Sequence, residues 1–571
     1  MIPTPTSTTP GEGTFTLTGS TPITTGSSEL TAVAAQFVAD TRLDSPHLLA
    51  FSAATGAAKA TSAAAAGSAA EAGSAEASSA NPAGSAEASP ATAAGSAEAG
   101  SAVEAASGGV RLVFSSDGLD DVPQTAGVRA DGAEVDERYG LDVTPDGIRV
   151  WSATTEGVYR GLTTLRQLIA VHGESIPCQR IVDGPRFAWR GLSFDVVRTF
   201  HPPETVRRVI DMCALYKLNV LHLHLTDDQG WRFEVASRPE LVKFGSLGAM
   251  ADRPGGYYTS LELADLNRYA EERFVTLVPE IDFPGHTGAV SKAFPELTTE
   301  LPGIPLPNGA TLEFHSLDPA DPEVWTFVED VVDAVLPQFP RSAYLHIGGD
   351  EAWGMSDEAH ATFVRRAAEL VRAKGKRVVG WQEIARADVD PADLTQYWLD
   401  IQDIDAISER PEVPAFLIEH LAKARHDVPK ALERGGKLLV SATTYLYFDR
   451  PHAAPSADPA QEEDRARVGL RAYPPATIQD GVAWDPVTNT PGVTSDDQLA
   501  GIEAAVWCET VTSRDDLEFL LLPRLPGAAE KAWSHTTPTN WPTYGADLAR
   551  QAPTWRNRGW TWFQSSEVDW T

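Results

Sequence analysis

The sequence predicts an α/β fold in which a (β/α)8 TIM barrel follows a small α+β domain, and three observations support this. From Pro185 onward, short apolar runs alternate with stretches of helical periodicity, as in parallel sheets whose strands are joined by helices. Eight such runs occur, which is the number that closes this kind of barrel. Acidic and aromatic residues follow nearly every run, where the loops of a barrel carry functional groups.

The candidate strands are short, apolar and separated by enough chain for a helix. They cover residues 191–194, 219–225, 275–281, 344–348, 377–381, 395–398, 437–442 and 501–506. Between the first two, Val206, Val209, Ile210 and Cys213 fall at i, i+3, i+4 and i+7, which predicts one buried face of a helix over 205–218. A closing helix is expected over 515–533.

The first domain is expected to cover residues 1–183, and the barrel residues 184–571. A strand-like segment at 14–17 precedes an amphipathic stretch at 28–43, and a further strand is expected at 110–114. Alternating segments on both sides of Pro145-Asp146-Gly147 predict a β-hairpin, followed by a helix over 157–171.

An insertion interrupts this domain at about 53–109. It consists almost wholly of Ala, Gly, Ser, Glu and Pro, so it has too little large apolar surface to offset the loss of chain entropy. We therefore expect it to be disordered.

The overall charge limits the kinds of partner. Lys and Arg number 46 and Asp and Glu 79, a formal net charge of −33, which argues against nucleic acid and anionic membranes as partners. The three cysteines have no spacing typical of a disulfide framework or a zinc site. No basic and apolar leader opens the sequence, so a cytoplasmic protein is expected, or a secreted one if a leader is missing.

The residues after the candidate strands suit a sugar ligand. Indole rings stack on the apolar face of a pyranose, while acids and arginine bind its hydroxyl groups in directional pairs. In chain order the strand ends supply Asp195 and Arg198; His224, Asp227, Asp228 and Trp231; Asp282 and His286; Asp350 and Glu351; Trp381 and Glu383; Trp398; Tyr447 and Asp449; Trp507 and Glu509.

A metal site is the main competing interpretation. His222 and His224 alternate on one strand, as in many metal-dependent barrel hydrolases, and Asp350 would complete such a site. Four strand-end tryptophans are poor neighbours for a hydrated cation, so we expect no metal. The two histidines are then interpreted as satisfied core residues, Asp195 as a structural acid, and Arg190 as an ion-pair partner inside the barrel.

Asp350 and Glu351 are adjacent, and this placement bears on mechanism. Glycosidases that use two carboxylates hold them roughly 5–5.5 Å apart for retention and about 6.5–9.5 Å apart for inversion. Neighbouring residues do not naturally straddle a bond in that way. They suit a different division of labour, in which Glu351 protonates the leaving oxygen and Asp350 orients a nucleophile that belongs to the substrate.

Four segments resemble the family 20 glycoside hydrolases, the β-N-acetylhexosaminidases. They are residues 189–198 (WRGLSFDVVR), 222–231 (HLHLTDDQGW), 279–286 (PEIDFPGH) and 346–351 (HIGGDE). The first domain resembles the accessory domain of that family. The resemblance implies retaining, exo-acting removal of terminal β-linked N-acetylglucosamine or N-acetylgalactosamine from an oligosaccharide or glycoconjugate. It implies an oxazolinium intermediate and no cofactor.

The resemblance also implies roles for residues. Glu351 would be the general acid and base, Asp350 would bind the acetamido N–H, and Tyr447 would hydrogen-bond the acetamido oxygen. The walls of the pocket would be Trp381, Trp398 and Trp507. The outer hydroxyl groups would be held by Arg198, Asp449 and Glu509, and the supporting polar network would be Asp227, Asp282 and His286, with His286 placed to orient Glu351.

Some positions stay open. The match weakens over 450–497, where Tyr473 is a candidate aromatic contact without a firm alignment. Trp231 and Trp353 are either packing residues or platforms for outer parts of the substrate. A catalytically silent sugar-binding barrel is the alternative function, although binding alone would not require the set of Asp350, Glu351 and Tyr447.

Overall fold

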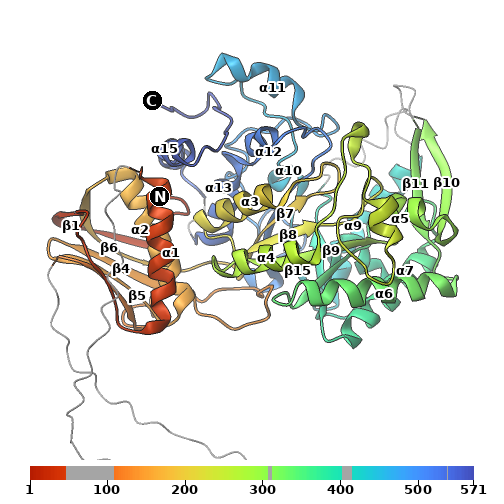
Figure 1. Ribbon diagram of the computed structural model, residues 1–571, viewed down its shortest axis with the longest axis horizontal. Helices are drawn as coiled ribbons and strands as arrows, with labels where there is room; N and C mark the ends of the chain where they lie inside the picture. Colours follow the sequence, from red (N-terminus) through yellow and green to blue (C-terminus); the bar gives the residue numbers. More distant parts are fainter. Residues whose placement is uncertain (47–107, 306–310, 401–414, 536–537) are drawn as a thin grey trace, which may run out of the picture.

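The computed structural model describes residues 1–46, 108–305, 311–400, 415–535 and 538–571. They form a small mixed-sheet domain beside a closed barrel (Figure 1). The fold class predicted from the sequence is therefore confirmed. The low-complexity insertion at about 53–109 lies outside the described residues except for its last two positions.

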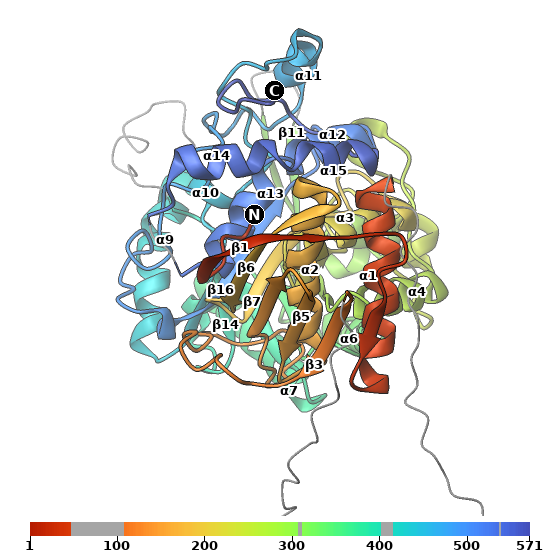
Figure 2. The same cartoon turned by 90° about the vertical axis from the view of Figure 1, so that its left-hand side faces the viewer.

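The first domain is built on a six-stranded sheet with the order β1-β6-β4-β5-β3-β2. Its strands are β1 (Ser7–Thr16), β2 (Ile23–Thr25), β3 (Val110–Phe114), β4 (Tyr139–Thr144), β5 (Gly147–Ser152) and β6 (Ser175–Asp183). The predicted hairpin is confirmed, because β4 and β5 pair antiparallel with Thr144 opposite Gly147. Helices α1 (Thr31–Asp44) and α2 (Thr155–His172) pack against each other, and α2 lies on the sheet (Figure 2).

All eight predicted barrel strands are present, with ends that differ by at most two residues from the predicted ones. They are β7 (Trp189–Asp195), β8 (Val220–His224), β9 (Thr276–Phe283), β12 (Tyr344–Gly348), β13 (Arg377–Trp381), β14 (Leu394–Tyr397), β15 (Lys437–Val440) and β16 (Leu499–Val506). Each pairs parallel with the next, and β16 pairs with β7 to close the barrel. Their side chains are almost all buried, which explains the continuous apolar runs in the sequence.

Helices cover the outside of the barrel. They are α3 (Pro203–Leu215), α4 (Ser260–Glu271), α5 (Gly288–Ala293), α6 (Pro322–Gln338), α7 (Asp357–Ala373), α9 (Ala415–Glu433), α10 (Thr443–Leu446), α11 (Glu462–Arg467), α12 (Arg514–Leu521), α13 (Arg524–Trp533), α14 (Trp541–Ala549) and α15 (Ala552–Asn557). In α3 the four predicted apolar residues are all buried. None of the helices within the described residues has the length and apolar character needed to cross a membrane.

Two features differ from the expectations. The single closing helix predicted over 515–533 is two helices, α12 and α13, because Pro523 interrupts it and Leu522 before the proline is extended. A hairpin of β10 (Thr298–Pro305) and β11 (Thr311–Leu317), which was not predicted, follows β9 and α5.

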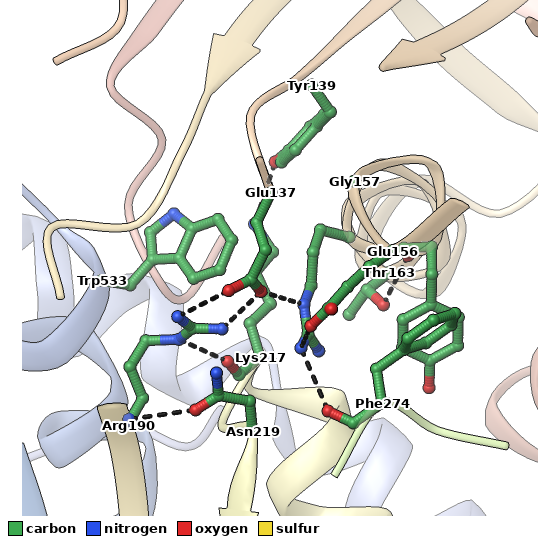
Figure 3. A network of polar contacts seen from close by, with 12 residues as sticks. Glu137, Tyr139, Glu156, Gly157, Thr163, Arg190, Lys217, Asn219, Phe274 and Trp533 are labelled. Carbon is green, nitrogen blue, oxygen red and sulfur yellow. Dashed lines mark hydrogen bonds and ion pairs between the residues drawn. The ribbon is translucent and has the colours of Figure 1, made fainter. Parts of the chain in front are cut away.

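A buried charge network joins the two domains (Figure 3). The carboxylate of Glu137, in the first domain, accepts hydrogen bonds from Arg190 at 3.0 and 2.6 Å, from Arg160 at 2.8 Å and from Arg129 at 2.9 Å. Arg190 belongs to β7 of the barrel and is fully buried. The ion pair predicted for Arg190 is thus present, but the predicted place is wrong: its partner comes from the other domain.

Candidate active site

The loop that follows β12 carries the two adjacent acids. Gly348 and Gly349 have φ values of +68° and +97°, which glycine adopts at little cost. A Cβ on Gly348 would lie 1.7 Å from Oδ1 of Asp282, so the neighbouring strand β9 leaves no room for a side chain at this position. Glu351 itself has a φ of +42°, an uncommon value for a residue with a side chain. The local backbone is thus held in an unusual shape where Asp350 and Glu351 project from the barrel.

Both acids face a cavity of about 220 Å³ at the C-terminal end of the barrel strands. Every predicted site residue except Asp449 lines this cavity. It is also lined by His224 and Leu470, which were outside the predicted set, and by Tyr473, which the sequence left as an open candidate.

Four aromatic rings form one side of the cavity. The ring centroids of Trp381 and Trp507 are 5.8 Å apart, and those of Tyr447 and Trp507 are 6.0 Å apart. Trp398 lies nearly parallel to Tyr447, with centroids 6.3 Å apart and planes at 9°. The indole N–H of Trp381 donates to Oε1 of the fully buried Glu280 at 2.8 Å, which fixes the orientation of that ring. The result is an apolar box that matches the C–H face and a methyl group of a sugar derivative.

Asp227 organises the polar side of the cavity. One carboxylate oxygen lies 2.7 Å from Nη2 of Arg198 and 2.7 Å from Nε2 of His224, and the other lies 3.2 Å from Nδ1 of His286. Burial disfavours its charge, but Arg198 and His286 hold the pKa of Asp227 well below its ordinary value. His224 in turn contacts Glu280 at 2.6 Å, so the polar network and the aromatic box share one buried carboxylate.

His286 lies between Asp227 and the two acids. Its Nε2 is 3.5 Å from Oδ2 of Asp350 and 3.7 Å from Oε2 of Glu351. Burial opposes protonation, yet Asp227 and Asp282 raise the pKa of His286 well above its ordinary value. Burial, aided by the charge of Asp350, raises the pKa of Asp282 well above that of a free carboxyl group. His286 therefore lies beside both acids, slightly closer to Asp350, in surroundings that favour its protonated form.

Burial also raises the pKa of Glu351, and the neighbouring charge of Asp350 acts in the same direction while His286 opposes it. A carboxyl group that keeps its proton in this way suits a general acid.

Glu509 lines the cavity, and Asp449 is a buried carboxyl group that interacts with the charge of Glu509 but does not line the cavity itself. Both oxygens of Asp449 and Oε2 of Glu509 are buried, and none accepts a hydrogen bond of ordinary geometry from the described residues. Burial and the charge of Glu509 raise the pKa of Asp449 well above its ordinary value. Buried polar atoms normally have partners, so Oε2 of Glu509, which lines the cavity, suits a hydroxyl group of a ligand. Arg198 lies nearby, 5.1 Å above the ring of Trp507.

The residues interpreted as structural behave mostly as expected. Asp195 accepts backbone N–H groups from Val197, Arg198 and Cys508 at 2.7 to 3.0 Å and thereby shapes the loops after β7 and β16. His222 is buried against Glu503 at 2.8 Å. Trp231 is a packing residue, fully buried and stacked on Phe233.

His224 departs from the core interpretation, because it also lines the cavity. Its position at the end of a strand, one residue before a polar loop, is the signal that could have included it. Tyr473 lies edge-on to Tyr447 with centroids 5.9 Å apart, and it comes from the 450–497 segment in which the motif match is weak.

A closed parallel barrel with paired acids, a tryptophan box and unpaired carboxylates at its C-terminal mouth defines a carbohydrate-cleaving hydrolase. Comparison with known families makes this specific. Residues 187–536 match the model of glycosyl hydrolase family 20, catalytic domain, and residues 1–184 match glycosyl hydrolase family 20, domain 2. The chain belongs to glycosyl hydrolase family 20, the β-N-acetylhexosaminidases, and the resemblance seen in its four motifs is confirmed.

Individual relatives agree. A β-N-acetylhexosaminidase of Cellulomonas fimi is 35% identical over 438 residues, which cover 76% of this chain and 82% of the relative. The structure of a family 20 β-N-acetylhexosaminidase from Streptomyces coelicolor A3(2) superposes with a TM-score of 0.76 at 28% identity, covering 100% of this chain and 98% of that one. A mutant Streptomyces plicatus β-hexosaminidase in complex with the product N-acetylglucosamine gives 0.75 at 29% identity, covering 100% and 97%.

Proposed function

We propose that this enzyme removes single N-acetylglucosamine or N-acetylgalactosamine residues from the non-reducing ends of β-linked substrates, with retention, by substrate-assisted catalysis. The observation that carries the proposal is the pair of adjacent acids, Asp350 and Glu351, at one end of an aromatic box. Two neighbouring carboxylates serve one face of the reacting centre, so the nucleophile comes from the substrate.

In the first step the 2-acetamido oxygen of the bound sugar attacks C1 while the glycosidic C1–O bond breaks. The proton of Glu351 passes to the leaving oxygen. Asp350 accepts the acetamido N–H and stabilises the positive charge that develops on the oxazolinium ion. The hydroxyl of Tyr447 donates to the acetamido oxygen, and Trp381, Trp398 and Trp507 enclose the acetyl methyl group and one sugar face.

In the second step a water molecule attacks C1 from the side that the leaving group has vacated. Glu351, now a carboxylate, takes a proton from this water, and the bond between C1 and the acetamido oxygen breaks. Two inversions at C1 leave the product with the configuration of the substrate.

The limited size of the cavity supports exo-action. At about 220 Å³ it has room for one sugar residue and not for a chain that passes through. Arg198 and Glu509, which line the cavity, supply polar groups for the outer hydroxyls of the sugar. The complex of the Streptomyces plicatus relative with N-acetylglucosamine supports the choice of sugar.

The test is a comparison of two aryl glycosides that differ only at C2. We expect hydrolysis of the aryl β-N-acetylglucosaminide and a far lower rate on the aryl β-glucoside, which has a 2-hydroxyl group and no internal nucleophile. Equal rates on the two would refute substrate assistance. Binding of N-acetylglucosamine without turnover of either glycoside would instead support the silent sugar-binding barrel.

A further inference from the structure

The loop between β8 and α4, residues 225–259, reaches across to two other loops at the same end of the barrel. We call it the β8–α4 loop. It contains the short 3₁₀ segment η4 (Met250–Asp252), and Arg253 follows directly. Ala251 and Asp252 have φ values of +54° and +57°, which are uncommon for residues with a side chain. The backbone is thus held in an unusual shape where it presents Arg253.

The guanidinium group of Arg253 binds main-chain carbonyls of both neighbouring loops. In the loop after β7, it donates to the carbonyl of Arg198 at 3.0 Å. In the loop after β16, it donates to the carbonyls of Glu509 at 2.9 Å, Val511 at 2.6 Å and Cys508 at 3.4 Å. All four acceptors are uncharged main-chain oxygens. Arg253 therefore ties the paths of two loops together from a third.

These two loops carry the polar groups that the proposed function assigns to the outer hydroxyls of the sugar. Arg198 and Glu509 both line the cavity. The side chain of Arg198 is held by the carboxylate of Asp227, 2.7 Å from Nη2. Oε2 of Glu509, in contrast, is buried and accepts no hydrogen bond of ordinary geometry from the described residues. The place of the Glu509 carboxylate therefore depends on its main chain, whose carbonyl Arg253 binds.

Other side chains also join the loops after β7 and β16, at neighbouring residues. Asp195 accepts the N–H of Cys508 at 2.9 Å, and the hydroxyl of Thr199 donates to the carbonyl of Val511 at 2.7 Å. Arg253 adds a direct link between the two residues whose side chains face the sugar, Arg198 and Glu509. Its contribution is therefore separable from the general stability of the two loops.

We propose that Arg253 is a positioning residue, which fixes Glu509 beside Arg198 and so sets how tightly the outer hydroxyl groups of the terminal sugar are held. The inference rests on the proposed function, because it assumes that Glu509 binds such a hydroxyl group. Arg253 is not among the residues that line the cavity, so it acts through the main chain of Glu509.

The test is a double-mutant cycle of Arg253→Met and Glu509→Ala in the full chain, with steady-state kinetics on the aryl β-N-acetylglucosaminide. Arg253→Met removes the donors and keeps an unbranched side chain. A shift of about 1 Å in a positioned group can cost on the order of 100-fold, and Glu509 is remote from the reacting bond, so we expect Arg253→Met alone to lower kcat/KM about tenfold.

In the Glu509→Ala background, the same substitution should lower kcat/KM less than about twofold, because no side chain remains to be positioned. An effect of Arg253 on the fold alone would lower kcat/KM by the same factor in both backgrounds, and that result would overturn the proposal. Arg253→Lys keeps the charge, but its single nitrogen does not span both loops as the planar guanidinium does, so the same non-additive loss is expected. It replaces Arg253→Met in the cycle if thermal unfolding shows that the methionine variant is not folded.

Arg208→Met is the matched control. This arginine, on α3, donates to the carbonyl of Gly559 at 2.6 Å and to Glu518 at 2.7 Å, and it does not line the cavity. Its replacement should change kcat/KM less than about twofold. An equal loss in this control, or unchanged kcat/KM in both Arg253 variants, would also overturn the proposal. A wild-type enzyme that does not hydrolyse the aryl N-acetylglucosaminide would instead refute the proposed function.

Discussion

Replacement of Gly348 by alanine tests whether the backbone after β12 is shaped for the reaction. The new Cβ would lie 1.7 Å from Oδ1 of Asp282 and 2.7 Å from its Cα. Carbon atoms in contact normally stay about 3.5–4 Å from their neighbours, so the loop or the end of β9 would have to move by roughly 2 Å. A displacement of about 1 Å at a catalytic group can cost on the order of 100-fold in rate.

We therefore expect Gly348→Ala to lower kcat/KM on the aryl N-acetylglucosaminide by at least about 100-fold, because Asp350 and Glu351 follow directly. The left-handed backbone at φ +68° would add about 1–2 kcal/mol of destabilisation. Gly375→Ala is the matched control: its φ is +81°, but no atom lies within 4 Å of the new Cβ.

Steady-state kinetics and thermal unfolding of both variants give the answer. The control should lose about 1–2 kcal/mol of unfolding free energy from backbone strain alone and keep its activity. A Gly348→Ala enzyme with kcat/KM within tenfold of wild type would refute the claim that contact with Asp282 positions the acids. Equal losses of activity in both variants would show that backbone strain, and not the contact, is responsible.

Four further predictions concern charge. Glu351→Gln should lower kcat on chitobiose by about 10²–10⁴-fold and affect aryl glycosides with good leaving groups less; equal losses would contradict its role as the acid. Because burial raises the pKa of Glu351 above 4.5, its proton is kept to higher pH, so the alkaline limb of the kcat/KM profile should lie above pH 4.5. The positive charge of His286 lowers the pKa of Glu351, so His286→Gln should raise this pKa and move the alkaline limb to still higher pH. Movement of the limb to lower pH would contradict this electrostatic role of His286. Glu137→Gln leaves the buried Arg190 short of its partner and should lower the free energy of unfolding by about 3–5 kcal/mol in denaturant titrations. The control Asp142→Asn, at a partly exposed ion pair, should cost less than about 1 kcal/mol; similar costs for the two would contradict the buried-network explanation.

Much of the fold could be predicted because the barrel strands are buried on both faces. Their sequences are continuous apolar runs, which stand out between amphipathic helices. The site could be located for a related reason: parallel strands bring their C-terminal ends to one mouth, so residues far apart in the chain become neighbours. Asp227 and Glu509 are 282 residues apart in the sequence, yet both line the same cavity.

Other features depend on contacts that leave no local pattern. Tyr473 reaches the cavity from an irregular segment whose path no periodicity describes. The partner of Arg190 lies in a loop of the other domain, and nothing in the sequence around either residue indicates the pairing. The division of the closing helix is a different case, because the sequence does show Pro523 at the break. The prediction gave more weight to the helical periodicity on both sides of this proline.

The buried carboxylate of Glu280 limits how this enzyme can change its choice of sugar. It holds Trp381 of the aromatic box and His224, which holds Asp227 and through it Arg198. A substitution of Glu280 that changes the orientation of the Trp381 indole would also remove the partner of His224 on the polar side of the cavity. The aromatic and polar sides of the pocket must therefore change together. New substrate preferences are therefore more accessible through the loop that carries Tyr473, which lines the cavity and has no contact with Glu280 among those described above.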